Sequence, residues 1–177
     1  MVTGQLNLMK LSDYFQQQAA YHAWATQRLL NEHVCLLTDA DYYRSAGLFF
    51  GSVHGTLNHL LVAETIWQAR FIQGKSLVMP LSAELEADRG KLTGALSAAS
   101  LRWADWLDCN DLTEQDAMLH YNRTDGQATS LPYAQTLGHV FNHATHHRGQ
   151  ITAALTAMGC ASPELDWVRL LQLQGAV

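Results

Sequence analysis

The sequence predicts an all-α protein, an antiparallel four-helix bundle with a small hairpin or loop before the last long helix. Apolar residues recur at helical spacing in four long stretches joined by short connections, and one segment of short mixed runs interrupts them. The chain has 177 residues, of which 48% are hydrophobic and 15% charged. This length suffices for one sizeable core and is too short for two large domains. We therefore expect residues 1–177 to form a single domain.

The first two long helices are expected before residues 36–38 and over residues 52–73. One face of the first carries side chains spaced by seven, four and four residues: Tyr14, Tyr21, Ala25 and Leu29. Ser12 or Asp13 is its candidate cap. The second helix has a stripe of apolar residues, namely Val53, Leu57, Leu60, Trp67 and Phe71. Gly74 is a plausible stop for it, because glycine readily adopts the conformation that ends a helix.

The third helix is expected to follow a turn at Pro80, with Ser82 as its candidate cap. Its stripe repeats at three, four or seven residues: Leu85, Leu92, Leu96, Ala99, Trp103 and Trp106. The pattern breaks after Asp108. Residues 117–131 then hold Asp125-Gly126 between short mixed runs, which is a strong signal for a tight β-turn. We expect a small hairpin here, with an irregular loop as the alternative.

The last long helix is expected to begin near residues 131–133 and to continue to Met158. Ser130 is a candidate cap, Pro132 is tolerated in a first helical turn, and Gly159 ends the pattern. A final short helix or turn is expected over residues 166–173.

Composition disfavours several classes of protein. There are 11 basic against 16 acidic residues, for a net charge of −5, so the chain lacks the excess of lysine and arginine that nucleic-acid binding requires. It has no run of about twenty apolar residues that would cross a membrane. Cys35, Cys109 and Cys160 are scattered, and Met1–Lys10 does not look like a secretory signal. These features predict a cytoplasmic protein.

Nine histidines are the unusual part of the composition. His143 and His147 are four residues apart, on a stripe of the fourth helix that otherwise looks like core. This spacing lets two imidazoles converge on one metal ion, although buried histidines can equally bond to polar groups of facing helices. His59 lies on a stripe of the second helix and is the expected third ligand. Three imidazoles would leave one coordination position open, as catalytic metal sites do.

The residue after His143 is alanine, so the glutamate that serves as general base in the HExxH motif of metalloproteases is missing. The wider segment, residues 138–150 (GHVFNHATHHRGQ), resembles the signature of the DinB/YfiT-like superfamily. Residues 52–59 (SVHGTLNH), residues 21–29 (YHAWATQRL) and Asp166-Trp167 are similar to its other motifs, in the expected order.

The resemblance implies a DinB-type four-helix bundle, usually a homodimer, that binds a divalent metal ion, zinc or nickel, through His59, His143 and His147. It also implies a metal-dependent enzyme of the thiol S-transferase or hydrolase type. The substrate would be a small molecule, with a low-molecular-weight thiol as a candidate. The alternative is a non-catalytic metal-binding or stress-response protein with the same site.

Several polar residues near these motifs have no assigned role. His139 either faces the substrate or forms hydrogen bonds in the core, and the core role is favoured. Glu64 either orients an imidazole or makes an ordinary polar contact. Arg148 and Gln150 either fix the last helix to its neighbours or hold an anionic substrate, and helix packing is favoured. His22 and His54 are expected to be structural.

Overall fold

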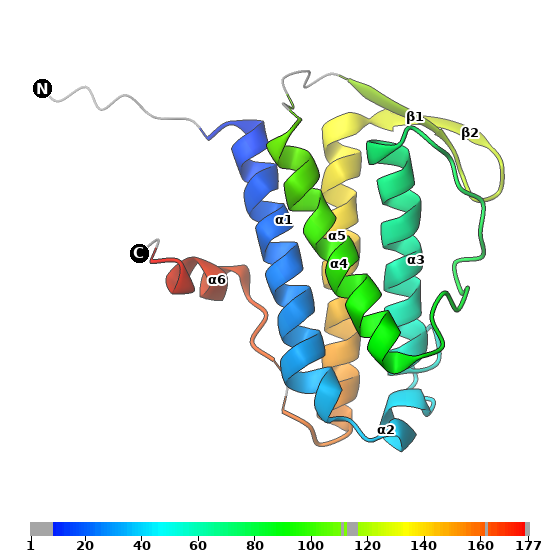
Figure 1. Ribbon diagram of the computed structural model, residues 1–177, viewed down its shortest axis with the longest axis vertical. Helices are drawn as coiled ribbons and strands as arrows, with labels where there is room; N and C mark the ends of the chain where they lie inside the picture. Colours follow the sequence, from blue (N-terminus) through cyan, green and yellow to red (C-terminus); the bar gives the residue numbers. More distant parts are fainter. Residues whose placement is uncertain (1–8, 111, 113–116, 162, 176–177) are drawn as a thin grey trace, which may run out of the picture.

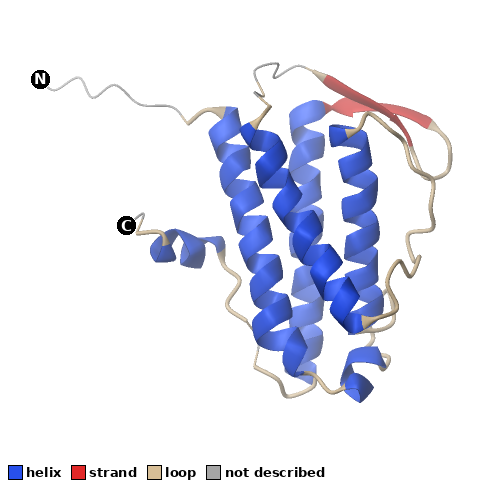
Figure 2. Cartoon of the chain, viewed as in Figure 1, coloured by secondary structure: helices blue, strands red, loops and turns tan. Residues whose placement is uncertain are grey.

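Four long helices lie side by side in the computed structural model, which describes residues 9–110, 112, 117–161 and 163–175 (Figure 1). Most of Met1–Lys10 is therefore outside the described residues. The long helices are α1 (Leu11–Arg28), α3 (Val53–Ile72), α4 (Arg89–Asp108) and α5 (Tyr133–Ala157). Figure 2 shows how little of the described chain is strand. The predicted four-helix bundle is confirmed.

The helices of the bundle run in two opposed pairs. α1 and α5 point one way, while α3 and α4 point the other (Figure 1). α1 packs against α4 and α5, and α3 packs against the same two helices. Residues 73–88, here called the return segment, bring the chain back along α3 so that α4 can start beside the beginning of α3. The expectation of short connections therefore fails at this segment.

Side chains of α3 hold the return segment in place. Asn58 donates from Nδ2 to the carbonyl of Glu86 and accepts from the Glu86 N–H, both at 3.0 Å. One helical turn earlier, His54 Nε2 lies 2.7 Å from a carboxylate oxygen of Glu84. His54 is thus a buried structural residue, as expected.

The start of α4 differs from the prediction. The helix begins at Arg89, because the Asp88 carboxylate accepts the Lys91 N–H at 2.8 Å and so caps it. Ser82 and Leu85 belong to the return segment, and the Leu85 side chain is exposed. Leu85 precedes Leu92 by seven residues. It therefore fits the helical spacing of the predicted stripe, although it lies before the start of the helix.

Two other predicted caps are also wrong. α1 begins at Leu11 after Lys10, so Ser12 and Asp13 lie inside its first turn. α5 begins after Pro132, and Ser130 is part of a strand. By contrast, Ser52 caps α3, where its hydroxyl accepts the Gly55 N–H at 3.0 Å.

Short helical elements continue α1 as far as Leu36, where the pattern is expected to fade. A π-helical turn (Leu29–His33) and a 3₁₀ turn (Val34–Leu36) continue it. The unpredicted helix α2 (Asp39–Tyr43) is capped by the hydroxyl of Thr38. At the other end of the chain, α6 (Trp167–Leu173) matches the predicted short helix.

The predicted hairpin is present as β1 (Met118–Asn122) and β2 (Ala128–Pro132), which pair antiparallel with Asn122 opposite Ala128. Gly126 in the turn has φ +85°, a conformation that favours glycine. The hairpin lies across the end of the bundle where α3 finishes and α5 starts (Figure 1).

The core lies between the four helices and is built largely from the predicted stripes. Trp103 of α4 and Leu57 of α3 are fully buried, whereas Tyr14 of α1 is exposed and Trp67 and Trp106 are partly buried. None of the described helices combines the length and apolar character needed to span a bilayer.

Candidate metal centre

The three predicted ligands lie together between α3 and α5. His59 is near the middle of α3, and His143 and His147 occupy successive turns of α5. His143 Nε2 is 3.2 Å from His59 Nε2 and 3.2 Å from His147 Nε2. His59 and His147 are buried and His143 is partly buried. Side chains distant in the sequence thus form one cluster of three nitrogens.

Local packing fixes the position of the His59 ring. Phe50 stacks on it, with ring centroids 3.8 Å apart and planes 14° from parallel. The Phe50 backbone approaches the start of α3 so closely that a Cβ at Gly55 would lie 2.1 Å from its carbonyl oxygen. Glycine at position 55 therefore permits the contact that brings Phe50 over His59.

Hydrogen bonds orient two of the three imidazoles. His59 Nδ1 lies 2.8 Å from the carbonyl oxygen of Leu81 in the return segment, and His147 Nδ1 lies 2.8 Å from Gln150 Oε1. Both partners are acceptors, so each Nδ1 carries the proton and donates it. The Nε2 atoms of His59 and His147 are then unprotonated and direct lone pairs into the cluster.

Burial keeps these imidazoles neutral. It lowers the pKa of His143 to about 3, with further lowering from the charges that the neighbouring histidines would carry. Burial also lowers the pKa of His147 to about 4, against the opposing effect of its bond to Gln150. The pKa of His59 is lowered by burial too, opposed by the Leu81 carbonyl. Neutral imidazoles are the form that binds metal ions.

The residues fit a divalent metal ion. Two imidazole nitrogens about 2.05 Å from one tetrahedral cation lie about 3.3 Å apart, close to the 3.2 Å between His143 Nε2 and each of its neighbours. Without a cation, the Nε2 lone pairs of His59 and His147 would both face the His143 ring, whose Nε2 carries at most one proton for the two of them. The donor set and the fixed Nδ1 protons therefore suit a divalent transition-metal ion.

A cavity of about 220 Å³ opens beside the cluster. His59 and His143 form part of its wall, the return segment contributes Leu81, and the hairpin contributes Tyr121 and Arg123. The histidine cluster therefore has space on one side, where a small molecule could reach it. A structural metal site, in contrast, is closed on all sides.

The structure separates the residues whose roles the sequence left open. His139 is exposed and lines the cavity, with its ring centroid 5.7 Å from that of His143, so it is not the core residue that was favoured. His146 is exposed and does not join the cluster. Gln150 orients His147, a role that its i+3 spacing could have indicated.

Glu64 and Arg148 belong to a buried polar network beside the cluster. Arg148 donates to His22 Nδ1 at 3.0 Å, and His22 Nε2 lies 2.9 Å from a carboxylate oxygen of Glu64. Trp103 also donates to Glu64, at 2.6 Å. Burial raises the pKa of Glu64, but His22, the Trp103 hydrogen bond and the Arg148 charge together hold it below its usual value. Arg148 thus packs helices together, as favoured, and His22 is structural.

Sequence reasoning missed Arg70. It follows His59 by eleven residues, or three helical turns, and lines the same cavity. That spacing was a usable signal. No comparable signal placed Tyr121 at the cavity, because its position depends on how the hairpin folds over the end of the bundle.

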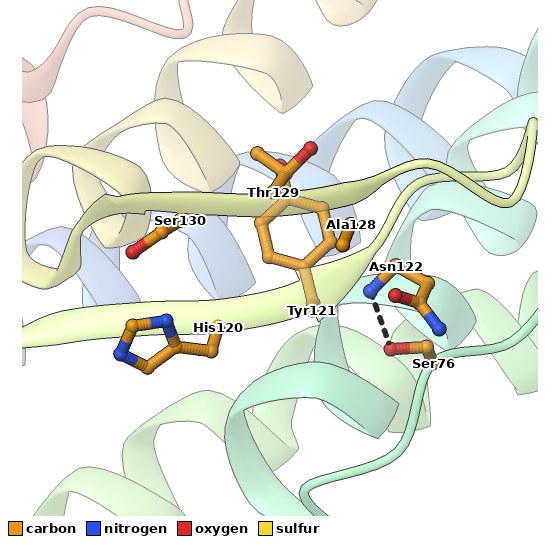
Figure 3. A pocket seen from close by; sticks show the side chains of 7 residues that line it. All are labelled: Ser76, His120, Tyr121, Asn122, Ala128, Thr129 and Ser130. Carbon is orange, nitrogen blue, oxygen red and sulfur yellow. Dashed lines mark hydrogen bonds between the residues drawn. The ribbon is translucent and has the colours of Figure 1, made fainter.

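A second hollow lies on the hairpin, and none of the three clustered histidines lines it. Ser76, His120 and Asn122 are among its lining residues (Figure 3). The Asn122 N–H donates to the Ser76 hydroxyl at 2.9 Å, so the hairpin is attached here to the return segment. Its polar groups form no cluster of metal ligands among the described residues.

Fold and site together define a four-helix-bundle protein with three histidines converging beside an open cavity. The family model of the DinB family matches residues 9–176, and the chain belongs to this family. The protein DinB of Bacillus subtilis (strain 168) is 26% identical over 162 residues, which cover 89% of this chain and 93% of that protein.

The fold is similar to that of YfiT from Bacillus subtilis, with a TM-score of 0.67 and 17% identity over 90% of this chain and 94% of that one. YfiT is described as "a probable metal-dependent hydrolase with an unusual four-helix bundle topology". At this identity the likeness shows the shared fold.

Proposed function

We propose that this protein is a metal-dependent enzyme in which His59, His143 and His147 hold a divalent cation, zinc or nickel. The observation that carries the proposal is the convergence of three Nε2 atoms, two of them freed by the Nδ1 bonds to Leu81 and Gln150. A bound cation of this kind supplies Lewis-acid activation of water, a thiol or a carbonyl group.

Neighbouring residues orient the ligand rings and leave space for a small substrate beside them. Leu81 and Gln150 fix two ligand rings, and Phe50 covers a face of the His59 ring. The adjacent cavity admits the substrate, with His139 on its wall. Because this cavity leaves the cluster accessible, a catalytic role is favoured over the non-catalytic alternative.

Hydrolysis is the reaction type that we propose first, supported by the description of YfiT and by the open side of the cluster. Thiol S-transfer to or from a low-molecular-weight thiol is the second proposal. It rests on the family resemblance, as does the proposal that the protein works as a homodimer.

The first experiment is metal analysis of protein purified without a histidine tag. We expect about one divalent ion per chain in the wild type, and its loss in His143→Ala. His120→Ala is the matched control, because His120 is an exposed histidine outside the cluster. Equal metal content in wild type and His143→Ala would remove the proposed site.

Metal-loaded protein is then screened with esters and amides, in the presence and absence of small thiols. Turnover with water alone supports a hydrolase, and turnover that depends on a thiol supports a transferase. Full metal loading without turnover of any of these substrates would favour the non-catalytic alternative.

A further inference from the structure

The cavity beside the histidine cluster has a one-sided charge distribution. Its charged lining residues among the described part of the chain are Arg70 and Arg123, and no described Asp or Glu lines it. Arg123 is exposed and lies 3.4 Å from Asp125, so its charge is partly matched on the outer side. Arg70 has no ion-pair partner among the described carboxylates.

Arg70 is buried, with 8% of its surface exposed. Its guanidinium lies 4.5 Å from the ring centroid of Trp67 and 4.1 Å from that of Tyr121. Nη2 donates to the carbonyl of Asn122 at 3.3 Å, and the buried Nε has no hydrogen-bond partner among the described residues. A buried cation normally has an anionic partner, and an arginine can donate five hydrogen bonds.

The two aromatic rings hold the guanidinium in place without neutralising it. Cation–π contacts stabilise its charge, and the one hydrogen bond that the guanidinium donates to a described residue is that of Nη2 to Asn122. Burial lowers the pKa of Arg70 relative to a free arginine, yet the group stays protonated at neutral pH. Arg70 therefore offers a fixed positive charge on the wall of the cavity that His59 and His143 also line.

We propose that this cavity binds the carboxylate of a small anionic substrate, with Arg70 receiving the carboxylate while the rest of the molecule extends toward the histidine cluster. A carboxylate matches the planar edge of a guanidinium and carries the single negative charge that would pair with Arg70. The volume of about 220 Å³ is below the roughly 300–1,000 Å³ of sites for drug-sized ligands. The substrate class is thus a small carboxylic acid.

The reacting end of this substrate depends on the proposed metal-dependent function, whereas the binding of its carboxylate can be measured without a metal. The probes are 3-mercaptopropanoate and 3-mercaptopropanamide, which differ in charge and little in shape. Binding to the full-length protein is followed by NMR through the indole signal of Trp67, the ring that contacts Arg70. Each probe is titrated into metal-free and zinc-loaded protein.

We expect the metal-free wild type to bind the carboxylate about tenfold more tightly than the amide, because charge-assisted hydrogen bonds are about twice as strong as neutral ones. Arg70→Gln should bring the ratio close to one. Arg70→Lys, which keeps the charge without the planar fork, should give an intermediate ratio and serves if Arg70→Gln does not fold. Arg44→Gln, an exposed arginine outside the cavity lining, is the control and should keep the full preference.

Equal binding of the two probes by the wild type, or a preference that survives in both Arg70 variants, would overturn the proposal. The two proposals also fail separately. Zinc loading without a carboxylate preference contradicts the carboxylate site alone. A carboxylate preference in a protein that binds neither zinc nor nickel contradicts the metal-dependent function alone.

Discussion

His59 and His147 each donate their Nδ1 proton to a fixed acceptor, and these bonds select the nitrogen that faces the cluster. For His59 the acceptor is a backbone carbonyl, that of Leu81, while for His147 it is the side chain of Gln150. Such partners of metal-binding histidines typically contribute 10–100-fold to metal affinity. The Gln150 side chain is the partner that a point mutation can remove.

Gln150→Leu should therefore weaken zinc binding by about tenfold or more, because the His147 ring loses the bond that fixes its orientation. The measurement is competition with a chelating zinc indicator. Gln135→Leu is the matched control: Gln135 is an exposed residue of the same helix, and this variant should bind zinc like the wild type. If Gln150→Leu bound zinc as tightly as Gln135→Leu, the bond would have no role in the site.

The lowered histidine pKa values predict a pH dependence of the metal-free protein. In the unfolded chain these imidazoles have a pKa of about 6.5, whereas burial lowers the pKa of His143 to about 3 and that of His147 to about 4 in the folded protein. Between these values the unfolded state binds more protons. Stability should therefore decrease as the pH falls below about 6.5, by on the order of 1 kcal/mol per pH unit for each histidine.

Urea unfolding in the presence of a chelator, at several pH values from 7.5 to 5, measures this dependence. Replacing one imidazole by an apolar side chain, in His143→Leu, should make the slope smaller, which separates its contribution from that of other titrating groups. Identical slopes for wild type and variant would contradict the lowered pKa of His143.

The spacing of the ligands was readable from the sequence, because residues four apart on a helix face the same way and His59 lay on a separate amphipathic stripe. Other contributions were not readable. The Leu81 carbonyl reaches His59 through the course of the return segment, and Arg70 meets Tyr121 through the fold of the hairpin. Neither contact leaves a pattern at fixed spacing along the chain.

A polar network fixes the rotational position of each long helix about its own axis. Its members are His22, Glu64, Trp103 and Arg148. These residues come from α1, α3, α4 and α5 respectively, so the network connects all four helices of the bundle. Arg148 directly follows His147 in the sequence. Anchoring Arg148 toward α1 therefore helps to fix how α5 presents His147 to α3.

Glu64→Gln should lower the free energy of unfolding by about 3 kcal/mol, because the change leaves the buried charge of Arg148 without its anion. Urea denaturation at neutral pH measures this. Glu32→Gln is the control, since Glu32 is exposed and its ion pair with Arg28 lies at the surface, where such pairs contribute about 1 kcal/mol or less. A similar small loss in both variants would mean that the network adds little stability.

The long helices could be predicted because their apolar stripes extend over several turns. Their ends were less predictable. The predicted caps at positions 12, 13, 82 and 130 rest on residue type alone, and the structure assigns none of them to a cap. The direction of α4, which runs parallel to α3, could not be predicted either, since nothing in the sequence of residues 73–88 indicates that they run the length of α3.

Across the whole molecule, a metal ion at the histidine cluster would connect α3 to α5. Because the ligands come from both helices, the ion binds the folded chain in preference to the unfolded one. At a free zinc concentration of about 100 times Kd, this adds about 2.7 kcal/mol of stability. For a chain of this size, we expect the melting temperature to rise by roughly 5–10 °C.

Thermal unfolding followed by circular dichroism, with zinc or with a chelator, measures this shift. His143→Ala should melt at the same temperature under both conditions. An equal rise in the variant would indicate that zinc stabilises the protein through some other site.

The length of the return segment limits how related chains can diverge. The His59 ring is oriented by a main-chain oxygen at position 81, which every amino acid possesses, so exchanging the side chain there leaves the acceptor intact. Adding or deleting a residue between positions 76 and 88 would instead slide that oxygen along α3 and misalign the ring. Relatives that keep all three histidines but vary in the length of this stretch should therefore differ in how tightly they hold a metal ion.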